Sequence, residues 1–181
     1  MELSNVTPAS YLQRWLAYII DALVLGLFTA LALYLLIYAR SLYACLAVTV
    51  LEGAYKPIME WRYGATLGKM AQKLVVVDSV TGQRMDLNQS LMRYLPWALG
   101  MFAAIFVITR QYQSADFAEV SDIYGYLDLA QNSPLSDSWV IQVISNIPIF
   151  SAAWLIADPW RQALHDKLAK TIVIQRTPVQ G

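Results

Sequence analysis

Long uncharged runs alternate with short charged connections along this chain. About 20 helical residues are needed to cross roughly 30 Å of hydrocarbon, and four runs come close to or exceed that length. They cover residues 15–37, 42–61, 94–109 and 138–157. The pattern therefore predicts an all-α membrane protein, a bundle of four transmembrane helices that forms one domain over residues 1–181.

The third run is the shortest and lies between Arg93 and Arg110. Its uncharged residues span the hydrocarbon only if both arginines extend their side chains toward the interfaces. We therefore expect Arg93 and Arg110 to lie at opposite membrane surfaces.

Charge is distributed unevenly over the predicted connections. If both termini are cytoplasmic, ten of the thirteen basic residues lie on the cytoplasmic side, in the termini and in the loop of residues 62–93. The opposite loop, residues 110–137, is acidic and carries Asp116, Glu119, Asp122, Asp128 and Asp137. Because short loops rich in Lys and Arg stay in the cytoplasm, this asymmetry predicts a protein of the cell (inner) membrane with both termini inside.

Two kinds of local structure are expected on the cytoplasmic side. Residues 65–73 are predicted to form a short basic helix at the membrane interface, with its lysines facing lipid phosphates. Residues 74–78 and 171–175 are rich in β-branched side chains, which favours extended strands. We expect these two segments to pair in a small cytoplasmic β element.

The acidic outer loop carries apolar residues at helical spacing: Phe117, Val120, Tyr124 and Leu127. This spacing favours an amphipathic helix on the outer face, with the acidic residues elsewhere on the helical wheel. The alternative is a solvated acidic loop with only a partial helix.

Composition supports the membrane assignment and excludes several functions. The chain is 57% hydrophobic and 14% charged, which leaves too little polar surface for a soluble domain of this size. Its net charge of zero argues against nucleic-acid binding. A single cysteine, Cys45, cannot form an internal disulfide, and a single histidine, His165, makes a histidine-rich metal site improbable.

Enzymatic activity is not expected. Gly64 to Lys69 superficially resembles a phosphate-binding loop, but the glycines are one residue too close and Met70 replaces the required Ser or Thr. A hydrolytic triad would have to recruit His165, and no nucleophile-elbow motif is present. We therefore predict a non-enzyme that needs no metal and no cofactor.

Three charged residues inside the predicted spans are candidates for ion or proton coupling: Asp21, Glu52 and Lys56. If the first two spans form a hairpin centred near Arg40, Lys56 lies within a turn of Asp21, and Glu52 lies one turn further out. In one interpretation these charges and Arg14 only hold the helices in register. In the other, Asp21 or Glu52 titrates and exchanges a proton for a cation.

Three ordered motifs resemble the RDD family of small integral membrane proteins, over roughly residues 10 to 176. The first is the segment Tyr11 to Asp21, the second runs from Gly64 to Asp78, and the third is Arg161 to Thr171. The resemblance assigns motif positions to Arg14, Asp21, Gly64, Thr66, Gly68, Lys69, His165 and Asp166. Cation/proton antiport has been suggested for some relatives, and others look like accessory subunits.

The leading functional prediction is transport of a monovalent cation (Na⁺, Li⁺ or K⁺) against protons through the intramembrane carboxylates. The alternative is a non-catalytic membrane scaffold or accessory subunit that binds another membrane protein. Either role favours a homo-oligomer or a membrane-protein partner, because four spans enclose only a narrow path. For Asp166 we expect a structural role, in which its carboxylate receives Arg14 or Lys69 at the cytoplasmic interface.

Overall fold

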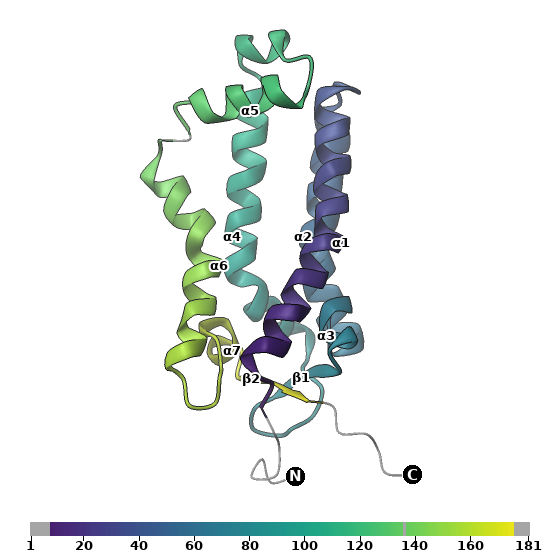
Figure 1. Ribbon diagram of the computed structural model, residues 1–181, viewed down its shortest axis with the longest axis vertical. Helices are drawn as coiled ribbons and strands as arrows, with labels where there is room; N and C mark the ends of the chain where they lie inside the picture. Colours follow the sequence, from purple (N-terminus) through teal and green to yellow (C-terminus); the bar gives the residue numbers. More distant parts are fainter. Residues whose placement is uncertain (1–7, 136, 176–181) are drawn as a thin grey trace. The chain divides into compact units, whose positions relative to one another are not determined.

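The computed structural model describes residues 8–135 and 137–175 of the chain (Figure 1). Four long helices dominate it: α1 (Tyr11–Ile37), α2 (Leu42–Tyr63), α4 (Leu87–Tyr112) and α6 (Trp139–Ala157). The shorter elements are the helices α3 (Leu67–Ala71), α5 (Ile123–Asn132) and α7 (Leu164–Leu168), the 3₁₀ helix η2 (Ala115–Glu119), and the strands β1 (Leu74–Asp78) and β2 (Thr171–Gln175).

The long helices match the predicted runs, with one difference. Helix α4 begins at Leu87 and ends at Tyr112, so it extends beyond both arginines that were expected to bound a short span. Within the described residues, α1, α4 and most of α6 are long and apolar enough to cross a membrane. Helix α2 does not qualify, since Glu52, Lys56, Glu60 and Arg62 interrupt its apolar surface.

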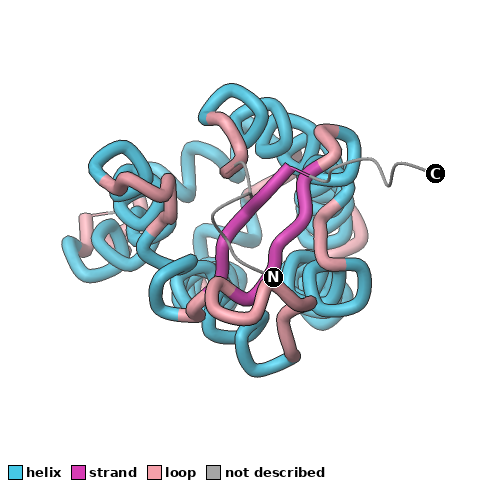
Figure 2. The backbone as a smooth tube through the Cα atoms, turned by 90° about the horizontal axis from the view of Figure 1, so that it is seen from below, coloured by secondary structure: helices cyan, strands magenta, loops and turns pink. Residues whose placement is uncertain are grey.

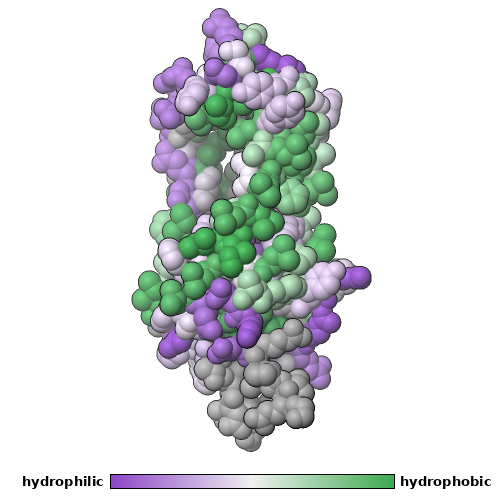
Figure 3. Space-filling model, turned by 45° about the vertical axis from the view of Figure 1, so that its right-hand side comes forward, coloured by the Kyte–Doolittle hydropathy of each residue, from purple (hydrophilic) through white to green (hydrophobic). Residues whose placement is uncertain are grey.

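The apolar side chains of these helices point outward. Only 11%, 17% and 6% of the residues in the most apolar windows of α1, α4 and α6 are buried by the protein itself. Leu23 is 70% exposed, Leu27 74% and Ile156 79%, and Figure 3 shows apolar side chains covering the visible surface of the long helices. Such surfaces are stable only in contact with lipid or with another protein.

The chain divides into two compact units, and each of the four long helices contributes residues to both. We call the first the sheet unit; it comprises Met1–Val24, Ala54–Pro96 and Ile149–Gly181. The second, called the loop unit, comprises Leu25–Gly53 and Trp97–Pro148.

The sheet unit contains the predicted β element. Strands β1 and β2 pair antiparallel, with Val76 opposite Val173, and so confirm the expected pairing of residues 74–78 with 171–175 (Figure 2). Neighbouring backbone protects both outer edges. The amide of Val76 donates to the carbonyl of Gly64 (2.7 Å), and the amide of Ala9 donates to the carbonyl of Val173 (3.1 Å). The sheet therefore has no free edge at these positions for another chain to pair with.

Each strand follows a matching helix and turn. In both cases a five-residue helix (α3 or α7) is followed by two residues and then by a five-residue strand. The second connecting residue is a lysine in the left-handed region, Lys73 with φ 55° and Lys170 with φ 52°. We call these segments module 1 (residues 66–78) and module 2 (residues 163–175).

The loop unit has an apolar core formed by α1, α2 and the acidic loop of residues 110–137, which we call the acidic segment. Its buried members are Ala32, Leu36, Ile37, Cys45, Val48, Phe117, Val120 and Tyr126. Arg40 holds the acidic segment through hydrogen bonds: Nη1 donates to the carbonyl of Phe117 (2.9 Å), and Nη2 donates to that of Val120.

The acidic segment differs from the predicted amphipathic helix. A helical stretch is present but is broken between η2 and α5, so the four apolar residues do not share one face. Phe117 and Val120 are buried, whereas Tyr124 is 79% exposed and Leu127 47%. The break arises because Asp122 adopts an extended conformation and caps α5 by accepting the amide of Gly125 (2.8 Å).

Candidate functional site

The centre of the sheet unit is a buried arginine. Arg93 on α4 is 1% exposed and binds two carboxylates that lie far apart in the sequence. Its Nε donates to Glu60 Oε2 (2.9 Å), and its Nη1 donates to Asp166 Oδ1 and to the hydroxyl of Thr171. The side chain of Arg93 therefore does not extend away from the protein as expected, because two carboxylates inside the sheet unit satisfy its guanidinium.

Asp166 is fully buried and lies between two arginines. Its Oδ2 accepts Arg14 Nη1 (3.0 Å) and the backbone amide of Ala163 (3.0 Å). Of the two partners expected for Asp166, Arg14 forms the ion pair, whereas Lys69 binds Glu60 instead. Burial alone would raise the pKa of the Asp166 carboxyl, but the charges of Arg93 and Arg14 outweigh it and hold that pKa well below its usual range. Asp166 is therefore a fixed anion.

The same network includes Glu60, which sequence reasoning missed. Glu60 on α2 is 1% exposed and forms ion pairs with Arg93 and with Lys69 of α3. Lys69 thus binds within the protein, so for this lysine of residues 65–73 the expectation that it faces lipid phosphates is wrong. A signal was present in the sequence, since Glu60 lies one helical turn after Lys56 within the second apolar run.

Asp21 anchors the start of α3. Its carboxylate accepts three hydrogen bonds, from the hydroxyls of Tyr55 (2.8 Å) and Thr66 (2.6 Å) and from the amide of Gly68 (2.8 Å). Thr66 is also the N-cap of α3. Asp21 therefore joins α1 to the start of α3 through hydrogen bonds.

The two motif glycines have distinct structural roles. A Cβ atom on Gly68 would overlap the carbonyl oxygen of Ala17, so only glycine lets α3 approach α1 this closely. Gly64 follows α2 with φ +73°, a conformation that favours glycine, and its carbonyl accepts the amide of Val76. The motif of residues 64–69 therefore builds the connection from α2 to β1.

His165 joins α7 to α6. Its Nδ1 lies 2.8 Å from Ser151 Oγ, and the same hydroxyl oxygen accepts the backbone amide of His165 (3.1 Å). Burial lowers the pKa of His165 well below 6.5, against the raising effect of nearby Asp166. Ser151 is 1% exposed, so this serine and histidine lie inside the packed protein rather than at an open cleft.

The candidate coupling residues divide between the two units. Asp21 and Lys56 belong to the sheet unit, whereas Glu52 belongs to the loop unit. The hydrogen-bond partners of Asp21 are Tyr55, Thr66 and Gly68, and Lys56 is not among them. Glu52 Oε1 accepts the hydroxyl of Thr29 (3.0 Å). Within the described residues, no basic side chain forms an ion pair with Glu52.

Exposed apolar helices, a small sheet and buried ion pairs together define a helical integral membrane protein. The chain belongs to the RDD family, whose family model matches residues 8–170 and so covers most of it. No curated protein and no solved structure matches the chain. Among the motif positions, Arg14 and Asp166 form an ion pair, and Asp21 binds Thr66 and Gly68.

Proposed function

We propose that this RDD family protein exchanges a monovalent cation for protons across the membrane, with Glu52 as the carboxylate that alternates between them. The observation that carries the proposal is the isolation of Glu52 from basic side chains in the described chain. Its hydrogen bond comes from the neutral hydroxyl of Thr29. A carboxylate at membrane depth is costly to leave charged, about 3 kcal/mol on insertion scales, and a bound proton or cation removes that cost.

The other acidic groups are less suited to this role. Arginine or lysine neutralises Glu60 and Asp166 directly, and the carboxylate of Asp21 accepts three hydrogen bonds that join α1 to α2 and α3. Carboxylate oxygens that already have several donors are less available to a cation than those of Glu52, whose hydrogen bond comes from a single hydroxyl. The proposal therefore favours Glu52 over Asp21.

Purified protein in proteoliposomes tests the proposal. A pulse of Na⁺, Li⁺ or K⁺ should change the pH inside vesicles that contain the wild type. Glu52→Gln preserves shape, removes titration and should abolish this response. Asp21→Asn should keep the response in whatever fraction of that variant folds. The matched control is Asp137→Asn, which changes an exposed carboxylate of the same unit.

Two results would contradict the proposal. Undiminished exchange in the double variant Asp21→Asn/Glu52→Gln would exclude both carboxylates. A wild type that folds normally but gives no pH change with any of the three cations would favour the alternative, a scaffold or accessory subunit. The extensive fixed charge network of the sheet unit supports that alternative, because such a network serves to hold helices together.

We also propose that α2 is a fourth membrane span and that both termini lie in the cytoplasm of the cell, at the inner membrane. The basic residues that follow α2 and the acidic segment after α4 support this orientation. Cysteine substitutions in a Cys45→Ser background test it. Tyr43→Cys and Ser121→Cys should react with an impermeant thiol reagent from outside, and Val80→Cys from inside. Reaction of Tyr43→Cys from the same side as Val80→Cys would show that α2 does not cross.

A further inference from the structure

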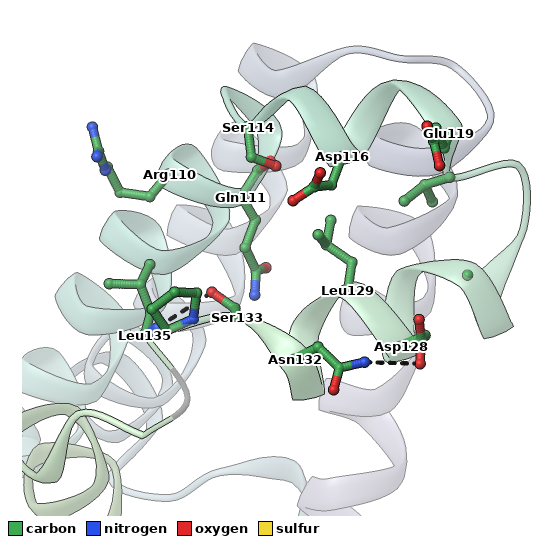
Figure 4. A pocket seen from close by; sticks show the side chains of 13 residues that line it. Arg110, Gln111, Ser114, Asp116, Glu119, Asp128, Leu129, Asn132, Ser133 and Leu135 are labelled. Atoms are coloured by element: carbon green, nitrogen blue, oxygen red, sulfur yellow. Dashed lines mark hydrogen bonds between the residues drawn. The ribbon is translucent and has the colours of Figure 1, made fainter.

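The loop unit contains a cavity that the exchange proposal does not use. Its volume is about 550 Å³, within the range of small-molecule binding sites. It is open to solvent and lined by the end of α4, by η2, by α5 and by the residues that follow α5, and Figure 4 shows their side chains around it. The whole cavity belongs to the acidic segment and the helix end that precedes it.

Most of the charged residues that line this cavity are acidic. Asp116, Glu119 and Asp128 contribute carboxylates, and none of them forms an ion pair within the part of the chain that the structure describes. The one basic lining residue is Arg110, whose side chain points away from the other labelled residues in Figure 4. The cavity is therefore complementary to a positive charge.

A second feature is a buried amide directed into the cavity. Gln111 is only 5% exposed, and its Oε1 accepts the hydroxyl of Tyr126 (2.9 Å). Figure 4 shows the amide nitrogen of Gln111 on the cavity side, and no hydrogen bond from that nitrogen to another described residue is found. A fixed donor of this kind is suited to an oxygen acceptor on a ligand.

The arrangement of carboxylates favours an organic cation over a metal ion. No group of three His, Cys, Asp or Glu residues in the described chain is placed to hold a metal. The carboxylates are instead distributed around a cavity that Leu129 and Leu135 also line. An extended ligand can reach several carboxylates at once while its methylene groups contact the leucines.

We propose that the loop unit binds a small aliphatic amine that also carries an oxygen acceptor. Asp116, Glu119 and Asp128 attract its ammonium groups, and the Gln111 amide donates to its oxygen. Leu129 and Leu135 contact the carbon chain between them. This site is independent of Glu52 and of cation–proton exchange, so either can fail without the other.

Two related probes test the two halves of the site. L-Lysinamide carries two ammonium groups and a carbonyl oxygen, whereas cadaverine has the same diamine chain without the carboxamide. Titration calorimetry on the full chain in neutral detergent at low ionic strength should show saturable binding of both. L-Lysinamide should bind about fivefold more tightly, because only it accepts a hydrogen bond from Gln111.

Substitutions then separate charge from hydrogen bonding. The triple variant Asp116→Asn/Glu119→Gln/Asp128→Asn should weaken both probes by about tenfold or more, because each exposed pair contributes a small increment. Asp137→Asn, outside the cavity, should leave both affinities unchanged. Gln111→Leu should keep cadaverine binding and lose the preference for L-lysinamide.

Several outcomes would overturn the proposal. The first is a failure of the folded wild type to bind either probe, and the second is equal binding of the uncharged diacetyl derivative of L-lysinamide. Unchanged affinity in a triple variant that melts like the wild type would also exclude the carboxylates. If Gln111→Leu does not fold, the affinities of the two probes for the wild type still test the role of Gln111. Equal affinities of L-lysinamide and cadaverine would exclude its amide as a donor. Saturation by Ca²⁺ alone that blocks L-lysinamide would assign the site to a metal ion instead.

Discussion

The sheet unit and the loop unit bury different kinds of side chain. Of the ten polar residues buried among the described ones, nine belong to the sheet unit, and Gln111 alone belongs to the loop unit. The five ion pairs between an arginine or lysine and a carboxylate that are found in the described residues are also in the sheet unit. The loop unit is held instead by an apolar core and by the contacts of Arg40 with two backbone carbonyls.

This difference has consequences for specificity and stability. Buried ion pairs are demanding, because removing one partner leaves a charge that the interior cannot solvate. Substitutions in an apolar core are tolerated better, because they reduce buried apolar area and packed volume but leave no buried charge without a partner. The sheet unit should therefore be sensitive to small chemical changes, and the loop unit should respond more gradually.

The largest expected effect is that of Arg93→Leu. This change leaves Glu60 and Asp166 buried without their shared partner, and should destabilise the protein by about 3–5 kcal/mol. Thermal unfolding in detergent, followed by tryptophan fluorescence, measures the loss. The control is Arg110→Leu, which replaces an exposed arginine of the same helix. A similar melting temperature in the two variants would remove the proposed contrast between the units.

A pair of glycine substitutions should give effects of opposite sign. Gly68→Ala forces a Cβ atom against the carbonyl of Ala17 and should destabilise the sheet unit by about 1–3 kcal/mol. Gly125→Ala places its Cβ 3.5 Å from Asp122 Oδ1, an ordinary contact, and should stabilise α5 by about 0.5–1 kcal/mol. Melting temperatures of the two variants measure both effects. A destabilised Gly125→Ala would show that the loop unit tolerates an added methyl group no better than the sheet unit does.

Arg40→Met should loosen the loop unit selectively. It removes donors from the carbonyls of Phe117 and Val120, at a cost of about 1–2 kcal/mol. Hydrogen exchange followed by mass spectrometry should become faster in residues 115–132. Exchange in β1 and β2 should stay as in the wild type, and faster exchange there would mean that the two units do not respond separately.

Mild acid should act on the sheet unit through His165. Burial lowers its pKa well below 6.5, so the folded state takes up a proton less readily than the unfolded chain. Stability is therefore complete above about pH 6.5 and falls as the pH drops below that value. The aspartates do not contribute in this window, because their pKa values in the unfolded chain are near 4.

The variant His165→Asn should abolish this dependence between pH 6.5 and 5 while keeping an acceptor near the hydroxyl of Ser151. Melting temperatures between pH 6.5 and 5 measure this pH dependence for the wild type and for His165→Asn. A wild type whose stability is flat over the same range would contradict the assignment.

Local patterns in the sequence predicted the elements better than they predicted the site. Apolar runs located the four long helices, and β-branched segments located both strands, because each signal lies within about twenty residues. The contact of Arg14 with Asp166 was predictable from charge and from the cytoplasmic position of both residues. In the outer segment, helical spacing predicted one apolar face, but the cap at Asp122 restarts the helix and puts Tyr126 in the core instead.

The centre of the network was beyond such patterns. Arg93 lies 33 residues from Glu60 and 73 from Asp166, and no local rule selects these partners over others. The charges that flank an apolar run normally face solvent, so the sequence alone predicts that Arg93 extends toward the interface. The structure reverses this, because the longer helix α4 carries Arg93 inside the sheet unit.

Module 1 and module 2 of the sheet unit can be compared position by position within the same chain. Residue n of module 1 corresponds to residue n + 97 of module 2, and the central pair Val76 and Val173 obeys the same offset. Helices α2 and α6 also start 97 residues apart, at Leu42 and Trp139. A local two-fold axis through that central pair therefore relates the two strands, as in a symmetric dimer whose copies have been joined in one polypeptide.

Comparison of the two modules shows which residues they share and which residues differ between them. Three matched pairs are identical: Leu67 and Leu164, Lys73 and Lys170, and Val76 and Val173. These residues supply the helix start, the left-handed turn and the strand centre. The copies differ in charge at Lys69 and Asp166, so one binds a carboxylate and the other binds arginines. The backbones of the two modules thus match, whereas their side chains differ at the residues that form the ion network.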